Sequence, residues 1–170
     1  GLLSIKPKIY VGGSVVILPH FEPKMMLNAL ADYECTETGG VPAMYRMMLA
    51  EKELLQSLQF PCLQCLEMGS AVVGANLLNA VEKAFGSNVE EAYGLTEGGG
   101  PLRSPLDSRV SPRGSCGVPA PGVSVKLVKT DQFESEHQGE LWVKSPAVLH
   151  AYNNRPDMNQ ERLTDGWLHT

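Results

Sequence analysis

The sequence contains no run of apolar residues that approaches the length of about 20 needed to span a bilayer. Lysine and arginine are scarce as well. The sequence has 14 of them and 19 acidic residues, which gives a formal net charge of −5. A mildly acidic chain without a dense basic cluster has no general attraction for nucleic acid. The composition therefore argues against a transmembrane protein and against a nucleic-acid-binding protein.

Neither end of the chain resembles a natural terminus. The first six residues, Gly1–Lys6, lack an initiator methionine, and they lack the charge order and cleavage site of a secretory signal. The last six, Asp165–Thr170, include an aromatic residue and a leucine, whereas natural termini are more often polar and frayed. We therefore expect a segment of a longer protein.

Cysteine is rare, and the spacing of the four cysteines gives no strong metal signal. Cys62 and Cys65 form a Cys-x-x-Cys pair, but a zinc site needs about four ligands, and the sequence has no second pair at suitable spacing. A thioredoxin-like redox pair opens a helix, whereas Cys65 is expected to enter a strand. Together with Cys35 and Cys116, these residues are expected to be reduced, packing cysteines in a cytoplasmic protein.

What the first part of the sequence does contain is an alternation of apolar runs separated by glycine, proline and polar residues. Strands are expected at about 14–18, 35–41, 63–68 and 89–93, helices after Pro23, after Pro42 and over 76–85, and a linker around 56–61. Strands that alternate with helices predict an α/β fold, with a parallel sheet, flanking helices and right-handed crossovers.

The second part of the sequence is rich in proline and glycine after Pro101. The stretches 123–128 and 140–144 alternate loosely with period two on either side of the polar turn 131–139, and they predict an antiparallel pair. A short helix is expected after Pro156. The sequence thus predicts an α/β unit over residues 1–108, followed by a small antiparallel β-rich subdomain over residues 109–170.

Two turns rich in small residues follow the third and fourth expected strands. They are Gly69-Ser70-Ala71 and Tyr93-Gly94-Leu95-Thr96-Glu97. In open parallel sheets, ligands bind outside the carboxyl ends of the strands, and small side chains let a ligand approach the backbone. If these two strands are neighbours, both turns face one cleft.

The second turn combines an aromatic ring, a hydroxyl and a carboxylate. Tyr93 suits stacking on a base, Thr96 a hydrogen bond to a phosphate oxygen, and Glu97 the coordination of Mg²⁺. A carboxylate beside phosphates repels them, so this interpretation requires the cation. A simpler interpretation has Tyr93 in a core and the Thr-Glu pair at a helix cap or in solvent. The local pattern leaves both interpretations open.

The residues of this turn resemble a known motif. Residues 91–97, Glu-Ala-Tyr-Gly-Leu-Thr-Glu, are similar to the Tyr-Gly-x-Thr-Glu motif of the adenylate-forming superfamily, which includes acyl-CoA synthetases, aryl-CoA ligases, firefly-type luciferases and adenylation domains of peptide synthetases. Four more segments resemble family motifs in the expected order: the adenine loop at 69–71, Gly-x-Pro-x-Pro-Gly at 116–122, Gly-Glu-Leu…Gly-Tyr-x-Asn at 139–154 and Asp-Gly-Trp-x-x-Thr at 165–170. The resemblance covers essentially the whole chain and implies an internal part of the large N-terminal domain of the acetyl-CoA synthetase-like fold.

The resemblance implies a two-step reaction. A carboxylate attacks the α-phosphate of ATP to give an acyl-adenylate and pyrophosphate, and a thiol, commonly that of coenzyme A, then takes the acyl group. It implies ATP and Mg²⁺ as ligands and CoA as co-substrate. The residues that would contact ATP or AMP are Gly69, Ser70, Ala71, Val72, Glu91, Ala92, Tyr93, Gly94, Leu95 and Thr96. Thr96 would contact the α-phosphate and Glu97 would bind Mg²⁺, which gives these two residues the catalytic role.

The resemblance also implies an acyl pocket and leaves several questions open. The acyl pocket would lie near Gly39, Gly40, Gly94, Gly98 and Gly99. The adenine loop lacks the proline that the family often has, because Val72 stands in its place. The family's phosphate-binding lysine loop, its ribose-binding aspartate and its C-terminal lid would lie outside this chain, so the chain by itself is expected to be inactive. The ending Asp-Gly-Trp-Leu-His-Thr favours a CoA ligase. The alternatives are an adenylation domain or acyl-AMP ligase that loads a carrier protein and, in another class, a non-catalytic nucleotide-binding module.

Overall fold

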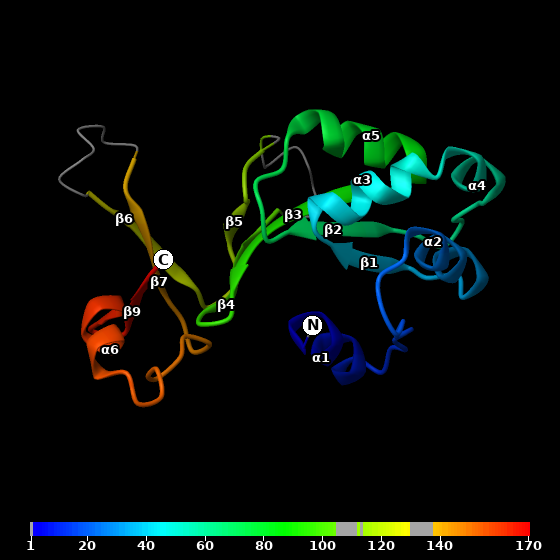
Figure 1. Ribbon diagram of the computed structural model, residues 1–170. Helices are drawn as coiled ribbons and strands as arrows, with labels where there is room; N and C mark the ends of the chain where they lie inside the picture. The colour runs from blue at the N-terminus through cyan, green and yellow to red at the C-terminus, as the bar shows by residue number, and fades with distance from the viewer. Residues whose placement is uncertain (1, 105–111, 113, 130–137) are drawn as a thin grey trace. The chain divides into compact units, whose positions relative to one another are not determined.

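The computed structural model describes residues 2–104, 112, 114–129 and 138–170 (Figure 1). The chain divides into two compact units. The first unit is formed by Gly1–Ala92 and Ser104–Gly117, and the second by Tyr93–Arg103 and Val118–Thr170. The expected boundary between residues 108 and 109 falls outside the described residues.

The first unit contains alternating helices and strands. Its helices are α1 (Leu2–Tyr10), α2 (Pro23–Asp32), α3 (Pro42–Ala50), α4 (Lys52–Ser57) and α5 (Ala75–Phe85). Its strands are β1 (Glu37–Gly40), β2 (Cys65–Gly69) and the larger part of β3 (Asn88–Leu95). Proline opens α2 and α3, and Gly86 ends α5 in the left-handed conformation with φ of 69°. The start of α2 and of α3 and the end of α5 therefore follow the local signals of the sequence, whereas α1 and α4 are not predicted by those signals.

The strands β1, β2 and β3 form the predicted parallel sheet. Glu37–Gly40 pairs with Cys65–Met68, and Cys65–Gly69 pairs with Asn88–Ala92. The sheet continues through β4 (Gly99–Arg103) and β5 (Val118–Pro119) in the order β1-β2-β3-β4-β5, and β4 pairs with β5 antiparallel. The α/β architecture is therefore confirmed, with a sheet that is mixed rather than purely parallel.

The core of the first unit lies between the parallel strands and the helices. The helices α3 and α5 lie side by side over one face of the strands (Figure 1). Leu66 and Met68, two residues apart on β2, are fully buried in this layer with Tyr45 and Leu78. Burying such an apolar side chain contributes about 1.5–3 kcal/mol. The Tyr45 hydroxyl donates to the carbonyl oxygen of Glu67 at 2.8 Å, which satisfies the polar end of that side chain.

Residues 14–18 do not form the strand that the sequence predicts. After α1 the chain reverses, and the N–H of Gly13 donates to the carbonyl of Lys8 at 2.8 Å. Val15, Val16 and Leu18 line a cavity beside β1, whereas Ile17 is exposed. A β-branched run favours extended backbone, but a strand forms only where a neighbour completes its hydrogen bonds.

The second unit contains the antiparallel pair that the sequence predicts. β6 (Ser124–Val128) pairs with β7 (Glu140–Lys144), and the sheet continues through β9 (Trp167–His169) to β8 (Leu163–Thr164). The short helix expected after Pro156 is α6 (Pro156–Arg162). Of the predicted polar turn at 131–139, residues 131–137 lie outside the described part of the chain.

The cysteines, the possible metal ligands and the helices can be compared with the metal-site and membrane-span alternatives considered from the sequence. Cys65 is the first residue of β2, as predicted, and all four cysteines are free thiols. Within the residues that the structure describes, no three His, Cys, Asp or Glu side chains gather as a group that could hold a metal ion. None of the described helices combines the length and the apolar character needed to cross a membrane.

Candidate functional site

The two turns singled out by the sequence follow neighbouring strands. β2 and β3 pair in parallel, and Gly69 is the register partner of Ala92. Gly69 is the last residue of β2 and Ala92 the last residue of β3 within the first unit, and Tyr93 follows Ala92 directly in the chain. The prediction that these strands are neighbours is confirmed. Of the predicted nucleotide-binding residues, those up to Ala92 belong to the first unit and those from Tyr93 onward to the second.

The first turn depends on a close approach between the two strands. A Cβ atom on Gly69 would lie 2.6 Å from the carbonyl oxygen of Ala92, which is nearer than such atoms approach, so the position requires glycine. The next residue, Ser70, has a φ of 65°. This left-handed conformation costs a non-glycine residue roughly 1–2 kcal/mol, and residues held in it cluster at ligand sites.

The first turn presents small and apolar side chains to solvent. Ser70, Ala71 and Val72 are exposed, and Val72 is 97% exposed although its side chain is apolar. Val73 is buried in the core of the first unit and anchors the end of the turn. The turn therefore offers both backbone groups and an uncovered apolar side chain to a ligand.

Glu91 is held by the protein itself. Its side chain is buried, and its Oε2 atom accepts a hydrogen bond of 3.1 Å from the N–H of Gly114. Its carbonyl oxygen accepts from the N–H of Ser104 at 2.7 Å. Both contacts lie within the first unit, so the Glu91 carboxylate braces the segment that contains Gly114 against β3.

The second turn is a tight reversal in the second unit. The N–H of Gly98 donates to the carbonyl of Leu95 at 3.3 Å, which leaves Thr96 and Glu97 at the two central positions. The Thr96 side chain is exposed and that of Glu97 is half-buried. Gly94 allows the chain to close here, because a Cβ at this position would lie 3.1 Å from the carbonyl oxygen of Gly99.

The donor set of this turn suits magnesium. Mg²⁺ prefers oxygen ligands and is commonly held by one or two carboxylates together with substrate phosphates. Glu97 supplies a carboxylate that remains partly accessible, and the neighbouring Thr96 hydroxyl is a hydrogen-bond donor for a phosphate oxygen. The residues present therefore fit a Mg²⁺ ion bound together with a nucleotide.

Two residues far along the chain, Leu149 and Tyr152, lie near Glu97, and neither is among the predicted site residues. The N–H of Leu149 donates to the carbonyl oxygen of Glu97 at 2.7 Å. Burial raises the pKa of Tyr152 above its usual range, and the negative charge of Glu97 and a hydrogen bond to its side chain raise it further. Tyr152 belongs to one of the family-like segments, but its position in that segment carries no signal of a contact with Glu97.

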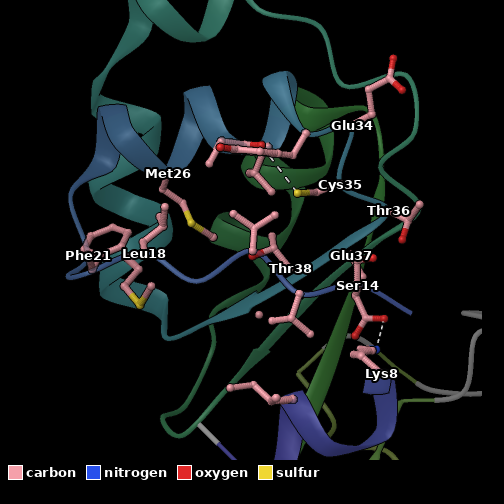
Figure 2. Close-up of a pocket in the computed structure, with 18 of the residues that line it drawn as sticks. Lys8, Ser14, Leu18, Phe21, Met26, Glu34, Cys35, Thr36, Glu37 and Thr38 are labelled. Carbon is pink, nitrogen blue, oxygen red and sulfur yellow. Dashed lines mark hydrogen bonds and ion pairs between the residues drawn. The ribbon is translucent and has the colours of Figure 1, made fainter. Parts of the chain in front are cut away.

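A cavity of about 600 Å³ lies in the first unit, between residues 14–21, α2 and β1 (Figure 2). Its walls include the apolar side chains of Leu18, Phe21 and Met26, and an ion pair between Lys8 and Glu37 lies at one side. Gly39 also lines it, as one of the glycines predicted for the acyl pocket.

The other predicted acyl-pocket glycines lie elsewhere. A Cβ on Gly40 would meet the Met44 and Tyr45 side chains at 3.4 Å, so that position is in contact with the core. Gly94, Gly98 and Gly99 belong to the second unit, where Gly98 lies against Leu168. The structure therefore brings the predicted glycines together in two groups.

The chain is similar to known proteins over most of its length. Residues 1–153 match the family model described as AMP-binding enzyme. The chain is 37% identical over 153 residues to a long-chain-fatty-acid–CoA ligase of Salmonella typhimurium, a match that covers 85% of this chain and 26% of the ligase. It is 30% identical over 164 residues to a luciferin 4-monooxygenase of Luciola mingrelica, which covers 94% of this chain and 30% of that protein.

The chain is also similar to a solved structure. The chain superposes with a TM-score of 0.81 on the O-succinylbenzoate coenzyme A synthetase of Bacillus subtilis in complex with ATP and magnesium ion. The identity is 25%, and the match covers 98% of this chain and 34% of the synthetase. The chain thus spans about a quarter to a third of the length of the relatives it matches.

Proposed function

The chain belongs to the family of AMP-binding enzymes, and we propose that it acts as part of an ATP-dependent acyl-CoA synthetase. In the proposed reaction, a carboxylate oxygen bonds to the α-phosphorus of ATP and pyrophosphate leaves. The sulfur of CoA then attacks the acyl carbon, and AMP leaves. The observation that supports this most strongly is the pairing of Gly69 with Ala92, because ligands of parallel sheets bind where such strands end. The similarity to a long-chain-fatty-acid–CoA ligase favours CoA as the acceptor.

The adenine of the nucleotide is assigned to the two turns. Backbone groups of Gly69–Ala71 face the base, and the exposed Val72 side chain covers part of one ring face. The ring of Tyr93, which is only partly buried, stacks on the base. Stacking of a base on an aromatic side chain is worth about 1–3 kcal/mol. Ala92, Gly94 and Leu95 contribute main-chain contacts. Glu91 acts indirectly, through the hydrogen bond that its carboxylate accepts from the N–H of Gly114.

The phosphates are assigned to the turn between Leu95 and Gly98. The Thr96 hydroxyl donates to an oxygen of the α-phosphate, and the Glu97 carboxylate holds Mg²⁺. A bound Mg²⁺ supplies charge neutralisation at the phosphates during attack by the carboxylate. The contribution of this chain is to hold a hydroxyl and a carboxylate at adjacent positions of one hydrogen-bonded turn. Catalysis of this kind consists mainly of positioning and electrostatic stabilisation.

The acyl group is assigned to the glycines near the end of β1 and beside the Glu97 turn. Gly39 borders the mostly apolar cavity, which suits an alkyl chain, whereas Gly40 lies against the Met44 and Tyr45 side chains. Gly94, Gly98 and Gly99 are the candidates in the second unit. A long-chain fatty acid is therefore the first substrate to test.

The experiment that tests this function is carboxylate-dependent exchange of pyrophosphate into ATP by the full-length protein. We expect exchange with at least one member of a panel of acids that begins with long-chain fatty acids, and thioester formation when CoA is added. Transfer to a phosphopantetheinylated carrier protein but not to CoA would instead indicate a carrier-loading enzyme. Binding of ATP without exchange for any acid would indicate a non-catalytic nucleotide-binding module.

A further inference from the structure

The peptide group between Glu97 and Gly98 is held at both of its polar atoms. Its N–H, which belongs to Gly98, donates to the carbonyl oxygen of Leu95 at 3.3 Å and closes the turn. Its carbonyl oxygen, which belongs to Glu97, accepts from the N–H of Leu149 at 2.7 Å. Such bonds are usually about 2.7–3.2 Å long, so the bond within the turn is weak and the bond from Leu149 is strong. The orientation of this peptide group therefore depends mainly on a residue that is distant in sequence.

The second half of the turn is packed against the rest of the second unit. Gly98 and Gly99 are both buried. A Cβ on Gly98 would lie 3.2 Å from the Leu168 side chain, and a Cβ on Gly99 would lie 3.5 Å from that of Ala147. A main-chain carbonyl in such surroundings needs a partner within the protein, and Leu149 supplies it.

The segment that presents the Leu149 N–H is ordered by Ser145. The Ser145 hydroxyl oxygen accepts from the N–H of Ala147 at 3.1 Å, and the Ser145 carbonyl oxygen accepts from the N–H of Val148 at 3.2 Å. A serine hydroxyl that bonds to the main chain two residues further on stabilises a turn. The Ser145 side chain therefore fixes the turn from which Leu149 reaches Glu97.

The direction of this peptide group affects the direction of the side chains at the turn. A peptide group is planar, and each residue has only two soft main-chain dihedrals. A hydrogen bond that holds the Glu97 carbonyl oxygen therefore restricts the ψ angle of Glu97, and with it the direction in which the carboxylate leaves the main chain. Thr96 occupies the other central position of the same turn, so its hydroxyl is subject to the same restriction.

We propose that Leu149 is a positioning residue for Thr96 and Glu97: its main-chain N–H fixes the peptide group after Glu97, and the Ser145 hydroxyl keeps that donor in place. The proposal rests on the proposed function, because the orientation of the two side chains affects catalysis only if they bind phosphate and Mg²⁺. Leu149 and Ser145 themselves contact neither ligand in this proposal. Misplacement of a reacting group by about 1 Å can lower a rate about 100-fold, so the loss of one positioning bond is measurable.

The test replaces Leu149 by its α-hydroxy acid in the full-length protein, which converts the amide into an ester and removes the N–H while keeping the side chain. The kcat of carboxylate-dependent pyrophosphate exchange is expected to fall at least about tenfold. Binding of Mn²⁺ in the presence of a non-hydrolysable ATP analogue, measured by electron paramagnetic resonance, is expected to weaken about tenfold. The KM for ATP at saturating Mg²⁺ is expected to change less than about threefold.

The matched control is the same ester at Val123, whose N–H donates to the Ala120 carbonyl oxygen at 3.0 Å in a turn that contains none of the proposed site residues. Both esters remove one main-chain hydrogen bond of the second unit, so both should lower the melting temperature by a similar amount. Only the ester at Leu149 is expected to change kcat and Mn²⁺ binding. Wild-type kcat and Mn²⁺ binding in both ester proteins would make Leu149 purely structural and would overturn the proposal.

Side-chain variants of Ser145 keep the proposal testable should the ester at Leu149 fold poorly. Ser145→Ala removes the hydroxyl that accepts from Ala147 and is expected to lower kcat about threefold and to weaken Mn²⁺ binding in the same direction. Ser145→Thr keeps a hydroxyl and is expected to restore both values. Unchanged values in Ser145→Ala, in a protein whose wild type is active, would overturn the inference alone. Wild-type protein that exchanges no pyrophosphate with any acid would overturn the proposed function and the inference with it.

Discussion

Gly69 of β2 and Ala92 of β3 are register partners, and a Cβ on Gly69 would lie 2.6 Å from the Ala92 carbonyl oxygen. We therefore expect Gly69→Ala to push the two strands apart where both turns begin. Such overpacking costs typically about 1–3 kcal/mol in the free energy of unfolding, which urea denaturation measures. The affinity of the full-length protein for ATP should fall as well.

The matched control for this change is Gly74→Ala. Gly74 has an ordinary φ of −84°, and a Cβ there would meet no atom within 4 Å. The control should change stability by less than about 0.5 kcal/mol. Equal stability and equal ATP affinity of the two variants would show that the close approach at Gly69 has no consequence.

Glu97→Gln in the full-length protein is expected to impair adenylation far more than folding. The amide keeps the shape of the side chain but removes the negative charge that attracts Mg²⁺. The Mg²⁺ concentration for half-maximal pyrophosphate exchange should rise by about tenfold or more, while the melting temperature should change little. Glu53→Gln, the same change on the exposed face of α4, is the control. Identical magnesium curves for wild type and Glu97→Gln would argue against the metal role.

Tyr93→Ala is expected to raise the KM for ATP, because the base loses a stacking partner worth about 1–3 kcal/mol. Tyr93→Phe keeps the ring and should retain most of the affinity. Tyr10→Ala removes a tyrosine side chain that is 92% exposed and serves as the control. A KM that is unaffected by Tyr93→Ala would remove this residue from the adenine site.

Tyr45 gives a prediction about alkaline stability. Burial raises the pKa of its hydroxyl far above the usual value, and the nearby Cys65 and Glu67 charges raise it further. The folded state thus favours the protonated form, so this contribution to stability is complete below the unfolded pKa of about 10 and is lost as pH rises above it.

Tyr45→Phe should therefore affect stability differently at neutral and alkaline pH. At pH 7 the variant should be less stable by about 0.5–1.5 kcal/mol, because the 2.8 Å hydrogen bond to Glu67 is gone. Above about pH 10 the difference from wild type should shrink and then reverse, since phenylalanine cannot ionise. Urea denaturation at several pH values measures both effects. A constant difference between the two proteins across this range would contradict the assignment.

Where short-range signals determine an element, sequence and structure agree. Proline at the first position opens α2 and α3, and glycine after the last residue ends α5, since each signal acts within one turn of helix. The alternation of apolar residues defines β6 and β7 in the same local way. The parallel direction of β1, β2 and β3 follows from the alternation of strands with helices, and the order of the three strands comes from the structure.

The elements that sequence reasoning missed depend on distant partners or contradict local preference. α1 contains Pro7, which is unfavourable inside a helix, and α4 has only six residues, in and beside the region predicted as a linker. β4 begins with Gly99-Gly100-Pro101, residues that are depleted in strands, and it forms because β3 and β5 lie beside it. Residues 14–18 are the opposite case, because their sequence is typical of a strand but they do not form one.

Some features of the candidate site can likewise be predicted from the sequence, and others cannot. The Thr96-Glu97 turn and the glycines around it are visible as a short motif, because a tight turn needs small residues close together in sequence. The hydrogen bond from the N–H of Leu149 to the Glu97 carbonyl oxygen is not visible, since nothing in the neighbourhood of Leu149 encodes the distant partner. The close approach of Gly69 to Ala92 is intermediate: the glycine is evident, but its reason emerges only from the register of two strands.

The exposed side chain of Val72 has a consequence for the heat of nucleotide binding. With 97% of it in water, an adenine ring that covers it would remove apolar surface from solvent. Burial of apolar surface lowers the heat capacity of a complex. Calorimetric binding of ATP by the full-length protein should therefore grow more exothermic with rising temperature, and Val72→Ser should flatten that slope.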